Sequence, residues 1–413
     1  MTLFDKIVKA QENLNGVVLK TPLQFSINLS EKFQASVYLK REDLQQVRSY
    51  KIRGAYNKIS HLNQTQKSEG IVCASAGNHA QGVAYSCQVL QIQGKIYMPK
   101  TTPNQKIKQV ELFGKSFVDI VLIGDTFDDA FHAAKQFSNE NQLEFIHPFD
   151  DLEVIAGQGT VGLEILSEKV PSIDYLLLPV GGGGLAAGVS TVFKQLGPAT
   201  KIIGVEPEGA PSMLKAIKAG EPVKLDQIDS FVDGAAVKRV GDATFEICKQ
   251  VIDDMHLVPE GKICSTILKL YNEEAIVVEP AGAISVAALD DYADQIKGKK
   301  IVCVVSGSNN DIERMQEIKE RSLQYEDLKH YFLIRFAQRP GALKEFVNQV
   351  LGPTDDITRF EYMQKNNKET APALVVIELQ AQENYQLLID NMQRYHINYT
   401  AINKNDNVFA YLV

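Results

Sequence analysis

The stretch "YLLLPVGGGGLAAGVSTVF" (175–193) decides the fold of this chain. Its 19 residues carry no charge, and 19 residues is about the length that a membrane span needs. Five glycines and one proline interrupt it, however. The stretch is therefore interpreted as a short buried strand, a glycine turn and the start of a helix, and a membrane span is rejected.

Other apolar runs repeat this pattern of a strand followed by an amphipathic segment. They are "GIVCASA" (70–76), "GKIYMP" (94–99), "FVDIVLIG" (117–124), "KIIGVE" (201–206) and "KIVCVVS" (300–306). Continuous apolar strands joined by helices predict an α/β fold with parallel sheets covered on both faces. Ligands of such sheets bind outside the carboxyl ends of strands, so the loops after residues 76, 180 and 305 are the candidates.

Composition limits the possible partners. The 413 residues are 45% apolar and 23% charged, with a net charge of −8, which is typical of a soluble protein of two or three domains. The acidic balance argues against nucleic acid and anionic membranes as partners. The five cysteines (73, 87, 248, 264, 303) lack CxxC spacing and are expected to be reduced, buried thiols. The start "MTLFDKIVKAQENLNG" has no apolar signal core, so a cytoplasmic location is expected.

The pattern changes near residue 312, where the charged segment "ERMQEIKERSLQYEDLKH" (313–330) predicts a helical connector. The order strand, helix, strand, strand, helix, strand follows and predicts a complete ferredoxin-like domain. The expected elements are strands 330–337, 357–364, 372–379 and 398–403 and helices 341–351 and 383–395, with a tight turn at "QRPGAL" (338–343). The predicted domains are residues 1–325 and 326–413.

The glycine run 181–184 allows two ligand interpretations besides simple close packing. Glycines after a strand let backbone N–H groups converge on an anion at a helix start, and phosphate is the natural guest. Alternatively, Gly182, Gly184 and Ala187 fit a relaxed dinucleotide fingerprint, and Glu206 lies where an acid that binds ribose would stand. A hydride-transfer enzyme would leave Lys51, "SAGNH" (75–79) and the serine of "VVSGSNN" (304–310) without roles.

Lys51 lies in "SYKIRGA" (49–55), just after the charged run "KRED" (40–43). Most lysines are solvated, and the local sequence alone does not distinguish a solvated lysine from a chemically active one. The other motifs of the chain distinguish these two possibilities. "SYKIRGA", "SAGNHAQG" (75–82), "GGGGL" (181–185), "EPAGA" (279–283) and "SGSNN" (306–310) occur in the order and spacing of the serine/threonine dehydratases, which are fold-type II pyridoxal-phosphate enzymes.

The resemblance covers almost the whole chain. "VDGAAVKRVGDATF" (232–245) and the C-terminal ferredoxin-like region resemble the short biosynthetic threonine dehydratases, which carry one ACT-like regulatory domain. It implies a two-lobed catalytic domain of the tryptophan synthase β-like fold. It also implies conversion of L-threonine to 2-oxobutanoate and ammonia, pyridoxal 5′-phosphate as cofactor, inhibition by L-isoleucine through the second domain, and a homo-oligomer (dimer or tetramer).

The resemblance also assigns roles to individual residues. Lys51 would carry the cofactor as a Schiff base and then act as the general base. Asn78 would bind the ring hydroxyl. The loop Gly181, Gly182, Gly183 and Gly184, with the backbone of Leu185, would bind the phosphate. Ser75, Ala76, Gly77, Asn78 and His79 would receive the substrate carboxylate; His79 could also be an ordinary neutral histidine, and Asn78 a helix cap.

Two positions bear on the type of reaction. Ser306 would face the pyridine nitrogen, and a hydroxyl cannot keep that nitrogen protonated as a carboxylate would, which favours elimination over transamination. Ala76 stands where racemases of the family carry a serine on the far face of the cofactor, so strict use of L-amino acids is expected. Some relatives bind a cation near the position of Asp233, but its neighbours do not match, and no metal is assigned.

Three alternatives remain open at this point. The chain could be another fold-type II lyase, such as a serine dehydratase or a β-replacing synthase. It could be a nicotinamide oxidoreductase, or an amino-acid-binding regulator without catalysis. The absorbance of a pyridoxal-phosphate imine in the purified protein, together with product analysis, distinguishes them.

Overall fold

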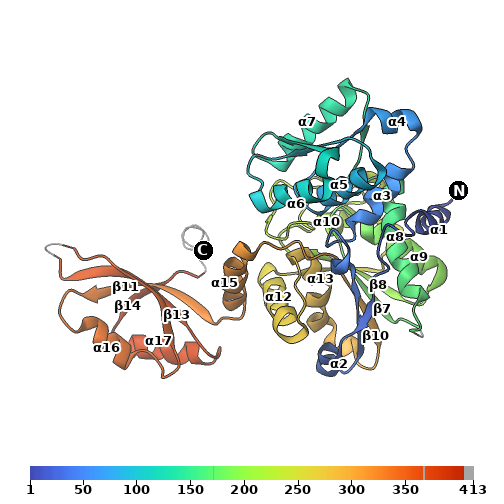
Figure 1. The fold of residues 1–413 in the computed structure, drawn as a ribbon. Coiled ribbons are helices and arrows are strands. Elements are labelled where there is room, and N and C mark those ends of the chain that lie inside the picture. The colour runs from blue at the N-terminus through green and yellow to red at the C-terminus, as the bar shows by residue number, and fades with distance from the viewer. Residues whose placement is uncertain (171, 366–367, 404–413) are drawn as a thin grey trace. The chain divides into compact units, whose positions relative to one another are not determined.

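The computed structural model describes residues 1–170, 172–365 and 368–403. Contacts divide the chain into two compact units, Met1–Asp311 and Ile312–Val413. The first unit consists of two lobes, each built on its own sheet (Figure 1). In the described part of the chain no helix is both long and apolar enough to cross a membrane.

The larger lobe is built on a six-stranded sheet in the order β1-β2-β10-β7-β8-β9, in which only the β1–β2 pair is antiparallel. Its central strands are apolar throughout because helices cover both faces. The strands are β1 (Leu23–Phe25), β2 (Ser36–Arg41), β7 (Tyr175–Pro179), β8 (Lys201–Pro207), β9 (Asp254–Val258) and β10 (Lys300–Val305). The helices are α1 (Leu3–Asn13), α2 (Ile27–Phe33), α8 (Leu152–Ser167), α9 (Gly184–Leu196), α10 (Ser212–Ala219), α11 (Asp242–Val251), α12 (Glu260–Glu274), α13 (Pro280–Ala287) and α14 (Ala293–Ile296).

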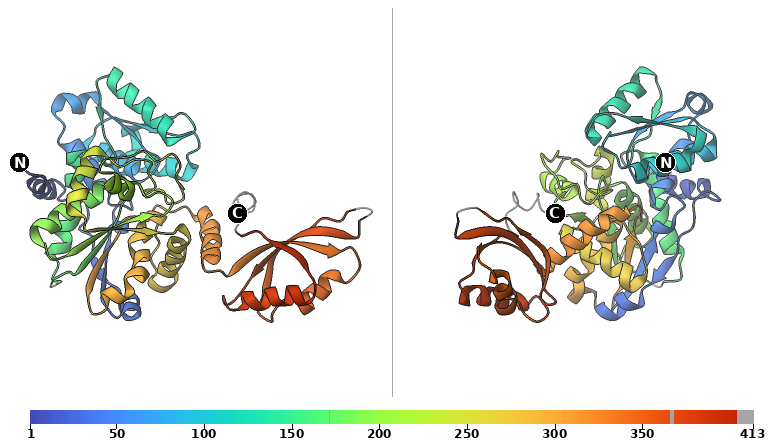
Figure 2. Two further views of the ribbon diagram at one scale, coloured as in Figure 1. Left: turned by 180° about the vertical axis from the view of Figure 1, so that it is seen from behind. Right: turned by 60° about the vertical axis from the view of Figure 1, so that its left-hand side comes forward.

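The smaller lobe holds a four-stranded parallel sheet in the order β5-β4-β3-β6. In the view from behind, its blue and cyan helices again surround this separate sheet (Figure 2). The strands are β3 (Ile71–Ala74), β4 (Gly94–Met98), β5 (Val118–Leu122) and β6 (Glu144–Phe145), and the helices are α3 (Lys51–Ser60), α4 (Gln64–Glu69), α5 (Asn78–Leu90), α6 (Asn104–Gly114) and α7 (Phe127–Glu140). Short 3₁₀ turns lie at Glu42–Leu44, Lys115–Phe117, Ala288–Tyr292 and Ile312–Arg314.

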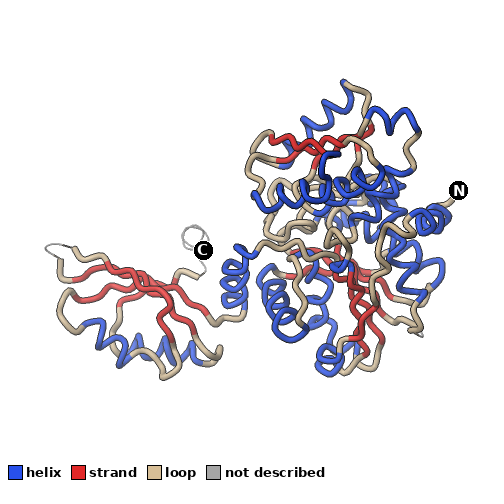
Figure 3. The backbone as a smooth tube through the Cα atoms, viewed as in Figure 1, coloured by secondary structure: helices blue, strands red, loops and turns tan. Residues whose placement is uncertain are grey.

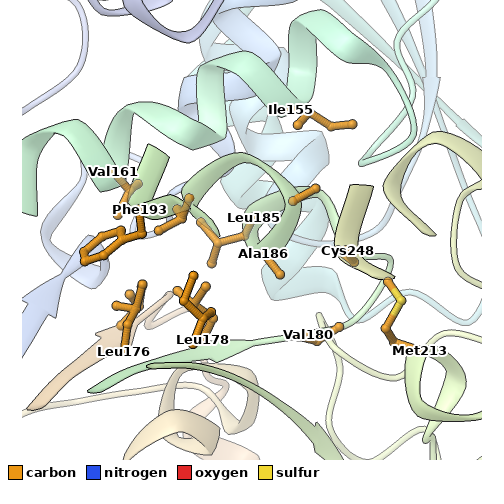
Figure 4. Packing of buried hydrophobic residues seen from close by; sticks show 14 of the residues in the cluster. Ile155, Val161, Leu176, Leu178, Val180, Leu185, Ala186, Phe193, Met213 and Cys248 are labelled. Atoms are coloured by element: carbon orange, nitrogen blue, oxygen red, sulfur yellow. The ribbon is translucent and has the colours of Figure 1, made fainter. Parts of the chain in front are cut away.

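The stretch that opened the sequence analysis forms β7, the glycine turn and α9, as predicted. Leu185 and Phe193 of α9 lie over Leu176 and Leu178 of β7 (Figure 4), and all four are at most 2% exposed. Burial of such side chains stabilises by about 1.5–3 kcal/mol each. This packing fixes the start of α9, and with it the turn, above the end of β7.

The second unit has the predicted βαββαβ order, and its antiparallel sheet runs β12-β13-β11-β14. Figure 3 shows α16 and α17 together on one face of the red strands. Its elements are α15 (Met315–Tyr325), β11 (Lys329–Ala337), α16 (Ala342–Gln349), β12 (Asp356–Tyr362), β13 (Thr370–Glu378), α17 (Asn384–Arg394) and β14 (Asn398–Ala401). The limit expected at residues 325 and 326 falls directly after α15 and stays a prediction; residues 404–413 of the expected domain lie outside the described residues.

The six predicted apolar runs all form parallel strands, but β1, β2, β6 and β9 were not predicted. The charged run 40–43 ends β2 and is not a solvated surface, because Lys40, Arg41, Glu42 and Asp43 are at most 8% exposed. Neighbouring charges of opposite sign satisfy one another there, which is what buried ions require.

Candidate active site

The predicted site residues converge where the carboxyl ends of β3, β7 and β10 face one another between the lobes. Ser49 forms an isolated bridge with Gly307, and the backbone N–H of Tyr50 donates to the Ser306 carbonyl at 3.2 Å. These bonds join the segment that carries Lys51 to the end of β10. From the other lobe, Asn78 at the start of α5 contacts the segment just before α13.

Lys51 is the first residue of α3 and is partly buried. Its Nζ donates to the carbonyl of Pro148 at 2.9 Å and lies 5.4 Å from the centre of the Tyr50 ring. Burial lowers the pKa of this amine to about 8, although the nearby Glu279 carboxyl partly offsets the effect. The neutral fraction of Lys51 near neutral pH is therefore much larger than that of a solvated lysine, and a nucleophilic or basic amine needs this neutral form.

The glycine loop is packed so closely that side chains cannot be added to it. A Cβ on Gly182 would lie 2.3 Å from the ring of Phe149, and Gly183 has φ +94°, which disfavours any other residue. The loop carbonyls bond inward, since Thr244 Oγ1 donates to the Gly182 oxygen at 2.7 Å and the Ala187 N–H to the Gly183 oxygen at 2.8 Å.

The backbone N–H groups of the same loop differ from its carbonyl groups in their hydrogen bonding. Within the described residues, the backbone N–H groups of 181–186 have no hydrogen-bond acceptor. A row of such donors at the start of a helix of 13 residues is suited to a phosphate group. The residues present therefore fit the phosphate of the predicted cofactor. Phe149, whose ring packs against this loop, follows Pro148, whose carbonyl accepts from Lys51.

The segment 75–79 forms a second start of a helix. Gly77 N–H donates to Ser75 Oγ at 3.2 Å, and α5 begins at Asn78 without a side-chain cap. Asn78 is therefore not a helix cap. In the described chain the backbone N–H groups of Ala76 and His79 have no hydrogen-bond acceptor, so they can donate to a bound carboxylate.

The side chain of His79 points away from such a ligand. Its Nε2 lies 2.9 Å from the carbonyl of Ile146, and the side chain is 2% exposed. Burial, followed by the charge of Lys51, lowers the pKa of His79 to about 3. The ring is neutral, and any contribution of His79 to substrate binding is confined to its backbone.

Ser306 is buried at the end of β10, and its hydroxyl donates to the Ala281 carbonyl at 3.2 Å. This bond is long for a hydroxyl donor. The hydroxyl can therefore rotate toward another acceptor, such as an unprotonated ring nitrogen, at little cost.

Glu206 does not have the position that the dinucleotide interpretation requires. It is fully buried and accepts the N–H groups of Met213 at 2.6 Å and Leu214 at 2.9 Å, so it caps α10. No face of this carboxylate is open to a ribose, and the dinucleotide interpretation fails here. Asp233 forms an ion pair with Lys106 at 2.5 Å, and in the described residues no group of three acidic, cysteine or histidine side chains is arranged around a metal position.

Two residues of this site, Glu279 and Asn309, were not predicted from the sequence. Glu279, quoted only as part of a motif, accepts the Asn78 Nδ2 at 2.6 Å, and the Asn309 side chain donates to the Asn78 Oδ1. The signal was present as a glutamate directly before a proline at the start of a helix, but the sequence does not reveal that its partner lies 201 positions away.

Comparisons with known proteins place this chain in a family. Residues 14–307 match the family model "Pyridoxal-phosphate dependent enzyme", and residues 320–412 match "C-terminal regulatory domain of Threonine dehydratase". The chain is 56% identical over 409 residues to the biosynthetic L-threonine dehydratase IlvA of Halalkalibacterium halodurans, covering 99% of each chain. It is 58% identical over 407 residues to that of Bacillus subtilis, covering 98% of this chain and 96% of that one.

A solved structure is similar as well. The processed form of threonine deaminase isoform 2 from Solanum lycopersicum has a TM-score of 0.74 and 43% identity, covering 78% of this chain and 93% of that one. The predicted fold, a two-lobed fold-type II catalytic domain with a C-terminal regulatory domain, is confirmed.

Proposed function

Because this chain belongs to the pyridoxal-phosphate-dependent enzymes, and within them to the biosynthetic L-threonine dehydratases, we propose that its site dehydrates and deaminates L-threonine to 2-oxobutanoate and ammonia. The observation that carries this proposal is the pairing of a desolvated lysine with a glycine loop whose N–H groups lack acceptors. Together, these two features suit a ligand that offers both a carbonyl carbon and a phosphate.

Pyridoxal phosphate, when bound, supplies an electron sink that stabilises negative charge on the substrate α-carbon. The loop 181–184 with the Leu185 backbone would hold its phosphate, Asn78 its ring hydroxyl and Ser306 its ring nitrogen. Lys51 would hold it covalently until substrate arrives. A neutral partner such as Ser306 does not enforce a charged ring nitrogen, which supports loss of the β-hydroxyl over transamination.

The protein's own groups then handle the protons. Lys51, once free, takes the proton from the substrate α-carbon, which suits an amine with a pKa of about 8. The N–H groups of segment 75–79 would hold the substrate carboxylate so that the α-proton faces Lys51. The β-hydroxyl would leave with a proton as water and give 2-aminocrotonate. Its imine tautomer would then react with water to give 2-oxobutanoate and ammonia. L-serine is expected to be a lesser substrate.

Three further properties belong to the same proposal. The C-terminal unit would bind L-isoleucine and lower activity, which its family match and its ferredoxin-like order support. The enzyme would act in the cytoplasm, which the five buried, unpaired cysteines support. It would form a homo-oligomer, a dimer or a tetramer.

Replacement of the proposed catalytic lysine tests the central proposal. The purified wild-type protein should show the visible absorbance of a pyridoxal-phosphate imine and release ammonia from L-threonine. Lys51→Ala should lose the absorbance and lower turnover by several orders of magnitude, since it removes both the covalent attachment and the base. Retention of both properties in Lys51→Ala, or their absence in the wild type, contradicts the proposal.

A further inference from the structure

Glu279 is a carboxylate that the proposed mechanism leaves without a role. It lies directly before α13, is 4% exposed and accepts the Asn78 Nδ2 at 2.6 Å. A carboxyl group buried in this way is costly unless hydrogen bonds compensate it. Asn78 is also the residue proposed to bind the ring hydroxyl of the cofactor, so the position of Glu279 bears on the reaction.

The other end of the Asn78 amide is also fixed. The Asn309 side chain donates to Asn78 Oδ1, and the same Asn309 Nδ2 donates to the Val47 carbonyl at 3.1 Å. A flipped Asn78 amide would place its NH₂ against the NH₂ of Asn309 and its oxygen against the carboxyl oxygen of Glu279. The flip would break the bond from Asn309, and also the bond to Glu279 when that carboxyl is ionised, so the two neighbours favour a single orientation of the amide.

From this arrangement we infer that Glu279 is a positioning residue for cofactor binding. Together with Asn309 it holds the Asn78 amide in one orientation, which leaves one N–H of Nδ2 for the ring hydroxyl of pyridoxal phosphate. The inference rests on the proposed function, because it concerns the same cofactor.

The charged groups around Glu279 agree with a role as an acceptor. Burial and the Asp233 carboxylate raise the pKa of Glu279 to about 8, although the hydrogen bond from Asn78, the charge of Lys106 and the backbone N–H of Asn309 oppose this rise. The charge of Glu279 also acts to raise the pKa values of Lys51 and Tyr50. A carboxyl group can accept the Asn78 N–H in either protonation state, so glutamine should replace Glu279 far better than alanine does.

The test compares cofactor affinity in a double-mutant cycle. Cofactor-free wild type, Asn78→Ala, Glu279→Ala, Glu279→Gln and the Asn78→Ala/Glu279→Ala double variant are titrated with pyridoxal phosphate, and binding is followed by the imine absorbance and by tyrosine fluorescence. Glu279→Ala should weaken binding about 5- to 13-fold in the presence of Asn78, the upper half of the range expected for one hydrogen bond between uncharged groups. In the Asn78→Ala background it should weaken binding less than about twofold, because the two residues act through one contact.

Two further variants separate positioning from folding. Glu206→Gln makes the same substitution at another buried glutamate, the one that caps α10, and should affect thermal unfolding without changing cofactor affinity more than about twofold. Asn309→Ala removes the second anchor and should weaken binding only while Asn78 is present. This variant provides the test if Glu279→Ala does not fold.

Equal losses in both backgrounds would overturn the inference, because Glu279 would then act independently of Asn78. So would wild-type affinity in Glu279→Ala, or a loss in Glu279→Gln as large as in Glu279→Ala. Failure of the wild type to bind pyridoxal phosphate would instead contradict the proposed function, so the two failures are distinguishable.

Discussion

Adding a single methyl group to the glycine loop should disrupt cofactor binding in Gly182→Ala. The new Cβ would lie 2.3 Å from Phe149 Cδ1 and Cγ and 2.5 Å from Cδ2. Carbon atoms in contact are normally about 3.5–4.0 Å apart, so the overlap exceeds an ångström. The Phe149 ring has little freedom to yield, because it packs edge-on against His147 with ring centres 4.7 Å apart.

The cost of this overlap must appear in stability, in affinity or in both. Overpacking a close-packed site typically costs about 1–3 kcal/mol. If the loop stays in place, the variant loses that much free energy of unfolding. If the loop moves, its N–H groups leave their positions and the affinity for pyridoxal phosphate falls about 5- to 150-fold, the same free energy expressed as binding.

The assay measures both quantities on one set of variants, by chemical unfolding of the cofactor-free protein and by titration with pyridoxal phosphate. Gly197→Ala at the far end of α9 is the matched control, because its Cβ would meet nothing closer than 3.6 Å. Gly182→Ala/Phe149→Leu should recover part of the loss by making room for the methyl group. Wild-type stability together with wild-type affinity in Gly182→Ala would refute the packing argument and the assignment of the loop to phosphate.

Four other outcomes are expected. The pKa of Lys51 is lowered to about 8, so the neutral fraction of the amine should rise from about a tenth at pH 7 to about nine tenths at pH 9. The rate of imine formation by the cofactor-free protein should rise with this neutral fraction, and a midpoint above pH 10 would show an ordinary lysine. Ser306→Ala should weaken cofactor retention by about 1 kcal/mol and Ser306→Asp should slow elimination, and unchanged spectra and rates in both would remove Ser306 from the site. Because position 76 is alanine, chiral analysis should find no D-threonine, D-allothreonine or D-serine formed at rates near that of dehydration. Isoleucine should raise the threonine concentration for half-maximal rate and make the plot of rate against threonine concentration sigmoidal, with a coupling of about 1–3 kcal/mol. A chain ending at residue 325 should keep its imine absorbance but lose this response to isoleucine. An intact enzyme unaffected by isoleucine contradicts the regulatory role.

The sequence predicted those parts of the fold that depend on local pattern. Runs such as "KIVCVVS" are apolar on every side because a central parallel strand is buried on both faces, and β10 lies where the run predicts. In the second unit, β11 has buried residues at alternating positions that pack against helices on one face of the sheet. The order of strands and helices along this part of the chain was predicted correctly.

Pairings between distant segments were not predictable in the same way. Strand β2 ends in charged residues, and only its pairing with β10, more than 250 positions later, makes it part of the central sheet. The contact of Asn78 with Glu279 has the same origin. Neither residue carries a local signal of its partner, since the sheets of two separate lobes bring them together.

The buried charges answer the question that the local sequence around Lys51 left open. Arg53, two residues after Lys51, donates to both oxygens of Glu42 at 2.8 Å and to those of Glu164 at 2.7 and 2.8 Å. Lys40 Nζ donates to the same Glu164 at 2.5 Å, and all these side chains are nearly inaccessible to solvent.

Removing one partner from such a network costs about 3–5 kcal/mol, because a buried charge is left uncompensated. The first turn of α3 is therefore held by paired charges to the end of β2 and to α8, a helix of the other lobe. A lysine at the first position of a helix fixed in this way has little freedom to move its backbone toward solvent. Its amine stays in the desolvated pocket that lowers its pKa, and this restraint depends on Glu164, 111 positions beyond Arg53 in the sequence.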